Sequence, residues 1–203
     1  MPADFDKQSY WHNRFSTESS FEWLSSSEEF MFILQPYLSK LHPSSARILH
    51  LGSGTSDLQN HLRRLGFVNV TNVDYEPLAI ERGRQMEEKS FGDVRMRYLV
   101  ADATQLFNGD DGFQRHEKFD LVVDKSTADA VSCGGEEPLL SMASCIKDCL
   151  AKGAAWISMS YSSYRFDVDH LPFHVQVIAQ ISTPKAKETD PDIHHSCYLL
   201  RPK

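Results

Sequence analysis

Two glycines and three acidic residues stand where hydrophobic stretches of the sequence end. Gly52 and Gly54 follow the first of these stretches, and Asp74, Asp102 and Asp124 each end a later one. Because the carboxyl ends of parallel strands meet at one edge of a sheet, we expect these residues to surround a common cleft. A carboxylate in that position accepts hydrogen bonds from the hydroxyls of a sugar, while the glycine turn offers free N–H groups. The pattern predicts a nucleoside site better than it predicts three unrelated turns.

The glycine turn narrows the class of nucleoside. A dinucleotide site has a third glycine three positions after the second, and this chain carries Asp57 there. A nucleoside without a pyrophosphate, such as S-adenosylmethionine, does not need that glycine. We expect Gly52 and Gly54 to let a ligand approach the backbone, and Ser56 or Asp57 to cap the helix that follows. An ordinary turn between a strand and a helix remains the alternative.

Composition bounds the class of protein. The chain has 203 residues, of which 41% are hydrophobic and 24% charged, as expected of one globular domain. A net charge of −7 argues against nucleic acid as a partner and is compatible with a basic substrate. The longest apolar runs fall short of the roughly 20 residues that cross a bilayer, so no membrane partner is expected. The polar, acidic start and four cysteines without a C-x-x-C pair are typical of a cytoplasmic protein with reduced thiols.

Strand and helix patterns alternate from residue 46 to residue 160, which predicts a parallel sheet covered by helices. A polar loop is expected at residues 108–112, between the third and fourth strands. Two later apolar runs, 175–181 and 196–200, have no helical pattern between them and predict an antiparallel hairpin. We therefore expect a single domain, 1–203, divided into a helical lid (1–45), a cofactor-binding core (46–160) and a C-terminal hairpin (161–203).

The predicted lid is rich in aromatic residues. Trp11 and Phe15 are four positions apart and would share one face of a helix. The serines at 25–27 precede two glutamates, a pattern typical of the start of a second helix. The aromatic side chains either pack on the sheet, or Trp11, Phe15 and Trp23 close over a ligand.

These motifs together resemble a known family. The sequence is similar to the seven-stranded S-adenosylmethionine-dependent methyltransferases, above all to the eukaryotic lysine methyltransferases of translation elongation factor 1-alpha, including the endothelin-converting-enzyme-associated type. The resemblance covers nearly the whole chain. It rests on Tyr10-Trp11, Phe21-Glu22-Trp23, the glycine turn, the run 69–75, the D-K-x-T-x-D-A run 124–130 and the run 156–160.

The resemblance implies an α/β fold: a Rossmann-like, doubly wound seven-stranded sheet, mostly parallel, with a C-terminal antiparallel hairpin and an N-terminal helical lid. It implies S-adenosyl-L-methionine as cofactor and S-adenosyl-L-homocysteine as product. The residues expected to bind the cofactor are Trp11, Phe15, Trp23, Gly52, Gly54, Asp74, Tyr75, Asp102, Ala103 and Lys125. Phe15 departs from the family, whose members often have tyrosine there, and His50 replaces the acid of more distant members.

Lys125 is unusual in such a list, because a second cation beside a sulfonium is unfavourable. We expect its backbone to meet the cofactor and its side chain to turn to solvent or to a carboxylate. If the nucleophile is a lysine amine, Asp124 or Asp129 is the candidate catalytic residue that orients it. No metal site is expected, because Pro172 interrupts a helical pairing of His170 and His174.

The resemblance favours a protein substrate, with a translation elongation factor as one candidate. Two alternatives remain: a methyltransferase acting on a small-molecule metabolite, and a cofactor-binding scaffold without turnover. The sequence does not reveal the oligomeric state.

Overall fold

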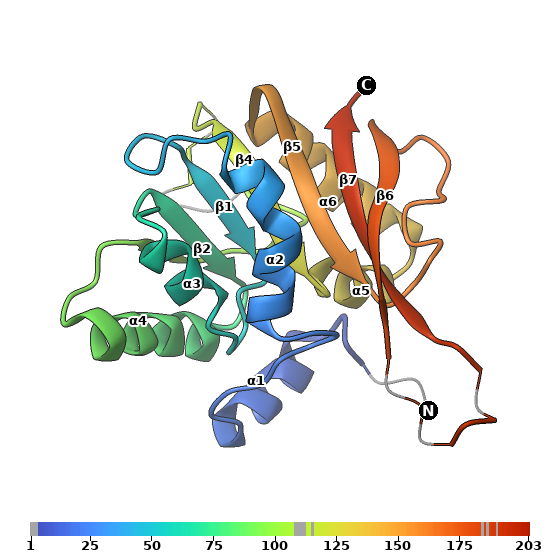
Figure 1. Cartoon of the computed structure of the whole chain (residues 1–203), viewed down its shortest axis with the longest axis horizontal. Helices are drawn as coiled ribbons and strands as arrows, with labels where there is room; N and C mark the ends of the chain where they lie inside the picture. Colours follow the sequence, from blue (N-terminus) through green and yellow to red (C-terminus); the bar gives the residue numbers. More distant parts are fainter. Residues whose placement is uncertain (1–3, 108–112, 115, 184, 186, 190) are drawn as a thin grey trace.

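The computed structural model describes residues 4–107, 113–114, 116–183, 185, 187–189 and 191–203. A seven-stranded sheet in the order β3-β2-β1-β4-β5-β7-β6 forms its centre, with helices on both faces (Figure 1). This confirms the predicted Rossmann-like fold. The loop expected at 108–112 lies outside the described residues.

Five strands are parallel and bring their carboxyl ends to one edge of the sheet. They are β1 (Ile48–Leu51), β2 (Val70–Asp74), β3 (Arg97–Val100), β4 (Phe119–Lys125) and β5 (Leu150–Ser160). Leu51, the last residue of β1, is paired with Val73 on one side and with Asp124 on the other. Asp74 is paired with Val100. The register therefore gathers the ends of β1 to β4 around one point, as the sequence predicted.

The last two strands form the predicted hairpin, and their place in the sheet could not be predicted. They are β6 (Phe173–Ser182) and β7 (His194–Pro202). The chain crosses beyond β5 to form β6 at the sheet edge, and β7 returns between the two, antiparallel to both.

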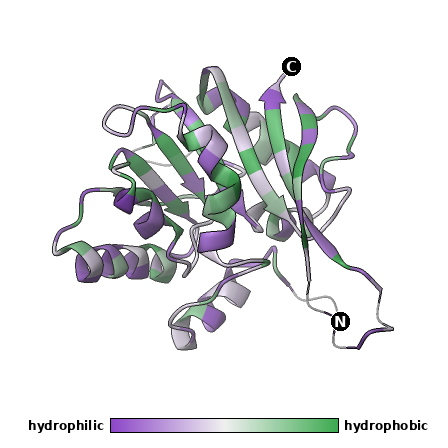
Figure 2. Ribbon diagram, viewed as in Figure 1, coloured by the Kyte–Doolittle hydropathy of each residue, from purple (hydrophilic) through white to green (hydrophobic). Residues whose placement is uncertain are grey.

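Each face of the sheet has its own hydrophobic core. On one face lie α2 (Ser27–Leu38), α3 (Leu58–Arg64) and α4 (Pro77–Phe91), and on the other lie α5 (Thr127–Ser132) and α6 (Glu136–Cys149). The outer surface of α4 carries many hydrophilic residues, as an amphipathic helix on a sheet requires (Figure 2). Among the described residues, no helix combines the length and the apolar character needed to cross a membrane.

Helix α2 belongs to the core and not to a lid. Ser26 and Glu29 form a capping box at its start, as the serine–glutamate pattern predicted. Phe30 and Leu34 are fully buried against β1, and burying such a side chain contributes about 1.5–3 kcal/mol. The segment predicted as a lid, 1–45, therefore has two parts, because α2 covers the sheet and only the part before α2 can act as a lid.

What remains of the predicted lid is helix α1 (Gln8–Thr17) with the segments on either side of it. Figure 1 shows α1 beyond the carboxyl ends of the strands, where it also contacts α4. We use the name lid for residues 4–25. This lid lies at the same edge of the sheet as the glycine turn and the acidic residues.

Candidate active site

A cavity of about 410 Å³ opens at the carboxyl ends of β1, β2 and β4, beneath the lid. It brings together side chains from the lid, the glycine turn and three strand ends. All ten residues predicted to bind a cofactor line it: Trp11, Phe15, Trp23, Gly52, Gly54, Asp74, Tyr75, Asp102, Ala103 and Lys125. Their shared location supports the predicted site.

The glycine turn joins β1 to α3, and its two glycines serve different purposes. Both have positive φ angles, 58° for Gly52 and 53° for Gly54, which favour glycine. A Cβ on Gly52 would overlap the side chain of Thr127, so this glycine makes room for the protein's own side chain. A Cβ on Gly54 would meet nothing closer than 3.9 Å, so only Gly54 leaves open space beside the cavity. The predicted helix cap is confirmed in position only: Asp57 is the N-cap residue of α3, but its side chain makes no capping hydrogen bond.

Asp74 is the most constrained acid in the cavity wall. One carboxylate oxygen accepts a hydrogen bond from the N–H of Gly54 at 2.9 Å, and the other accepts one from the N–H of Glu76, also at 2.9 Å. Burial raises the pKa of Asp74 from 3.8 to about 6, and these N–H donors oppose the shift. A carboxylate has about four acceptor sites, so Asp74 can still accept bonds from a ligand.

The pKa of Asp124 is also raised to about 6 by burial, which predicts a pH dependence of stability. A carboxyl group whose pKa is higher in the folded state stabilises the fold at low pH, and this contribution is lost as the pH rises through 6. We expect the free energy of unfolding to be larger at pH 5 than at pH 7, by about 1.3 kcal/mol for each of the two groups. Urea unfolding of the ligand-free protein measures the difference. In Asp74→Asn the difference should shrink, and an unchanged difference would contradict the assignment to Asp74.

The next strand end contributes Asp102 and Ala103. One oxygen of Asp102 accepts bonds from the N–H and the hydroxyl of Thr104, both at 2.8 Å, which fixes the turn after β3. Tyr75, after β2, lines the same part of the cavity, and its carbonyl accepts a bond from the side chain of Gln8 in the lid. The lid is thus tied to the edge of the cavity that these residues form.

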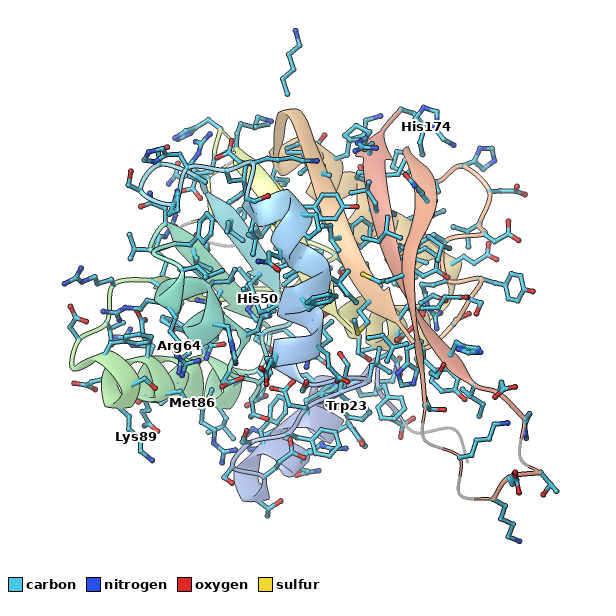
Figure 3. The ribbon with its side chains drawn as sticks, in the orientation of Figure 1. Trp23, His50, Arg64, Met86, Lys89 and His174 are labelled. Carbon is cyan, nitrogen blue, oxygen red and sulfur yellow. The ribbon has the colours of Figure 1, made fainter. Side chains whose placement is uncertain are left out.

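The lid holds a cluster of aromatic rings over the cavity. The centroid of Trp11 lies 5.5 Å from that of Phe15 and 5.7 Å from that of Trp23. Phe5, which the sequence analysis did not single out, accepts a hydrogen bond from the indole of Trp11 through its carbonyl and lines the cavity. Figure 3 shows Trp23 between α1 and the end of the sheet. Of the two roles left open for these aromatic residues, closing over a ligand fits this position better.

Lys125 is buried in the cavity wall, and its side chain turns to a carboxylate, as predicted for a cation in this place. The ammonium forms an ion pair with Glu22 of the lid and donates a second bond to the carbonyl of Ser25 at 2.9 Å. Sequence reasoning missed Glu22, although it lies in the quoted Phe21-Glu22-Trp23 run.

The two predicted catalytic acids do not line the cavity. Asp124 has no exposed surface, and its carboxylate accepts bonds from the indole of Trp156 at 2.7 Å and the N–H of Ala128 at 3.1 Å. Asp129 accepts bonds from the N–H of Tyr161 and the guanidinium of Arg165, both at 2.8 Å. Both carboxylates accept bonds from donors of the protein itself; Asp124 is buried and Asp129 is partly exposed. We therefore propose that they hold the wall in place, a change of role from orienting a nucleophile.

A substitution at Asp129 tests that change of role. Asp129→Asn keeps the size of the side chain but loses an acceptor for Tyr161 or Arg165, so unfolding should become easier by about 1–3 kcal/mol. Affinity for the nucleoside ligand should stay within about twofold of wild type. Thermal unfolding and calorimetric titration measure the two effects. A large loss of turnover in a variant that kept wild-type stability would restore the catalytic assignment.

His170 and His174, the pair considered for a metal, lie on different elements. His170 lies in a turn with a φ of 63°, and His174 lies in β6, so they share no helix face. Figure 3 shows His174 at the end of the sheet opposite Trp23. His50 is buried and bonded to Asn72, and burial lowers its pKa to about 4. No disulfide joins the cysteines within the described part of the chain.

A family model described as a methyltransferase domain matches residues 42–154, more than half of the chain. The chain belongs to the methyltransferase family. Methyltransferase srdJ of Neurospora crassa is 61% identical to this methyltransferase over 203 residues, which cover 100% of the chain and 86% of the relative.

More distant relatives share less of their length. EEF1A lysine methyltransferase 4 of Mus musculus is 28% identical over 174 residues, which cover 79% of this methyltransferase and only 63% of the mouse protein. Among solved structures, magnesium protoporphyrin IX methyltransferase of Synechocystis, determined with bound S-adenosylmethionine, has a TM-score of 0.65 at 11% identity. That alignment covers 99% of this chain and 98% of the other. At this identity the likeness shows the fold alone.

Proposed function

We propose that this methyltransferase binds S-adenosylmethionine beneath the lid and transfers its methyl group to a lysine side chain of a protein. The observation that carries the cofactor assignment is the carboxylate of Asp74, held by two backbone N–H groups at the edge of the cavity. When bound, the cofactor supplies a methyl group on a cationic sulfur. The attacking lysine must first lose a proton to solvent, because only the neutral amine has a free electron pair. The protein contributes binding, alignment and exclusion of water.

The residues of the cavity fit this cofactor from end to end. The acceptor capacity left on the carboxylate of Asp74 suits the hydroxyls of a ribose. Beside them, Tyr75 offers a ring for stacking, and the carboxylate of Asp102 with the backbone N–H of Ala103 offers an acceptor and a donor to an adenine. Towards the lid, Gly54 leaves space for the chain of the methionine part.

The size of the cavity supports a side chain as the second substrate. Its volume of about 410 Å³ is near the lower end of the roughly 300–1,000 Å³ typical of ligand pockets. If S-adenosylmethionine fills most of that space, an unbranched lysine side chain fits the remainder better than a whole metabolite. The similarity to a eukaryotic EEF1A lysine methyltransferase points the same way.

One observation favours a small-molecule substrate instead. The aromatic rings of Phe5, Trp11 and Trp23 make a lid over the cavity, and an apolar, covered pocket is typical of metabolite methyltransferases. With a small-molecule substrate, the cofactor and the residues around it stay the same, and only the molecule that receives the methyl group differs.

Labelled-methyl transfer separates the candidates. The purified protein is incubated with methyl-labelled S-adenosylmethionine and a cell lysate, and protein and small-molecule fractions are counted separately. The proposal predicts a labelled protein band that yields methyl-lysine after hydrolysis. Label confined to small extractable products would favour a metabolite substrate, and saturable binding without any transfer would favour a scaffold. A protein that did not bind S-adenosylmethionine would contradict the proposal as a whole.

A further inference from the structure

The wall of the cavity contains a buried cation, although its proposed ligand is itself a cation. Lys125 is only 7% exposed and lines the cavity with Gly52, Asp74 and Trp23. Burial lowers its pKa to about 8, so the ammonium is still mostly protonated at neutral pH. An uncompensated positive charge in such a place repels a sulfonium, because the low dielectric of the site strengthens the interaction.

The charge of Lys125 is compensated by a residue far away in the sequence. One oxygen of Glu22 pairs with the ammonium of Lys125, which lies 103 positions further along the chain. The other oxygen accepts a bond from the hydroxyl of Ser27 at 2.8 Å, which holds the carboxylate in place. Lys7, the other lysine that lines the cavity in the described part of the chain, is exposed and paired with its neighbour Asp6.

We propose that Glu22 is a specificity-determining residue that, by neutralising Lys125, allows the cavity to bind the charged S-adenosylmethionine in preference to its uncharged product. This inference rests on the proposed function. Methyl transfer turns the cationic sulfonium into the neutral thioether of S-adenosylhomocysteine. An unpaired ammonium on Lys125 therefore weakens the binding of the substrate and leaves the binding of the product unaffected. Without the carboxylate of Glu22, the enzyme would bind S-adenosylhomocysteine in preference to S-adenosylmethionine and would be inhibited by its product.

The substitution Glu22→Gln tests the charge and keeps the shape of the side chain. At the effective dielectric of about 20 of such a site, we take the repulsion between an unpaired ammonium and the sulfonium to lower the affinity about tenfold. At pH 7 we expect the dissociation constant for S-adenosylmethionine to rise about tenfold and that for S-adenosylhomocysteine to change less than about twofold. Isothermal titration calorimetry with each ligand measures both constants. The double variant Glu22→Gln with Lys125→Met, which lacks both charges, should restore the wild-type ratio of the two constants.

A structural role for Glu22 gives a different result. If the pair only fastened the lid, Glu22→Gln would weaken both ligands equally and the ratio of their affinities would stay at the wild-type value, which overturns the inference. If Glu22→Gln does not fold, Lys125→Met provides a second test, because it removes the ammonium and keeps the carboxylate of Glu22. The ratio of the two affinities should then shift in favour of S-adenosylmethionine. An unchanged ratio in Lys125→Met would also overturn the inference. A wild-type protein that binds neither ligand contradicts the proposed function itself, so the two failures are distinguishable.

Discussion

Replacing Asp74 by asparagine is expected to weaken the binding of S-adenosylmethionine on the order of a hundredfold. Both carboxylate oxygens accept backbone N–H bonds, and an amide offers only one acceptor, so its NH₂ group would face an N–H donor. Hydrogen bonds to a charged group contribute about 1.5–3 kcal/mol each, and a loss of about 2.8 kcal/mol corresponds to a hundredfold. Isothermal titration calorimetry measures the loss.

Asp120 provides the matched control for this substitution. Its carboxylate also accepts a backbone N–H bond, from Arg47 at 2.8 Å, but near the start of β4 and away from the cavity. Asp120→Asn should therefore leave the affinity within about twofold of wild type. An Asp74→Asn protein that folds and binds the cofactor as tightly as the Asp120→Asn protein would remove the basis of the cofactor assignment.

Replacing Gly52 by alanine is expected to cause the largest loss of stability among single changes at the glycine turn. The new Cβ would overlap the side chain of Thr127, whose hydroxyl donates a bond to the carbonyl of Leu51 at 2.9 Å. Overpacking of this kind costs about 1–3 kcal/mol, and the positive φ adds about 1–2 kcal/mol. We expect the free energy of unfolding to fall by roughly 2–5 kcal/mol in a urea titration.

Gly54→Ala separates the two contributions. Its φ is also positive, but its Cβ would have no close neighbour, so only the backbone strain of about 1–2 kcal/mol applies. If the cofactor uses the open space at Gly54, this variant should fold and yet bind the cofactor less tightly than the wild-type protein does. Equal losses of stability in the two variants would show that Thr127 does not crowd Gly52.

The sheet and its acidic edge could be predicted because the signals are local. Strands β1, β2 and β4 are buried on both faces and stand out as short apolar runs, and the rule that ligands bind beyond the carboxyl ends of parallel strands then places Asp74 and Gly54 together. Helix α2 was recognised by its serine and glutamate cap. Helix α5 was missed, because it has six residues and follows Ser126 in a left-handed conformation.

The parts that could not be predicted depend on where side chains point and on contacts between distant segments. Asp124 does end a strand at the right edge, but its carboxylate is taken by Trp156 of the neighbouring strand β5. No periodicity in the sequence reveals that. The pairing of Glu22 with Lys125 and the fit of Thr127 against Gly52 likewise require the folded chain.

A crystal structure of the protein with S-adenosylhomocysteine tests the central claim most directly. The account predicts the adenosyl group beneath the lid, with both ribose hydroxyls within hydrogen-bond distance of the carboxylate of Asp74 and the adenine beside Tyr75 and Asp102. A nucleoside bound away from Asp74, or a cavity closed by the protein's own side chains while the ligand lies elsewhere, would contradict it.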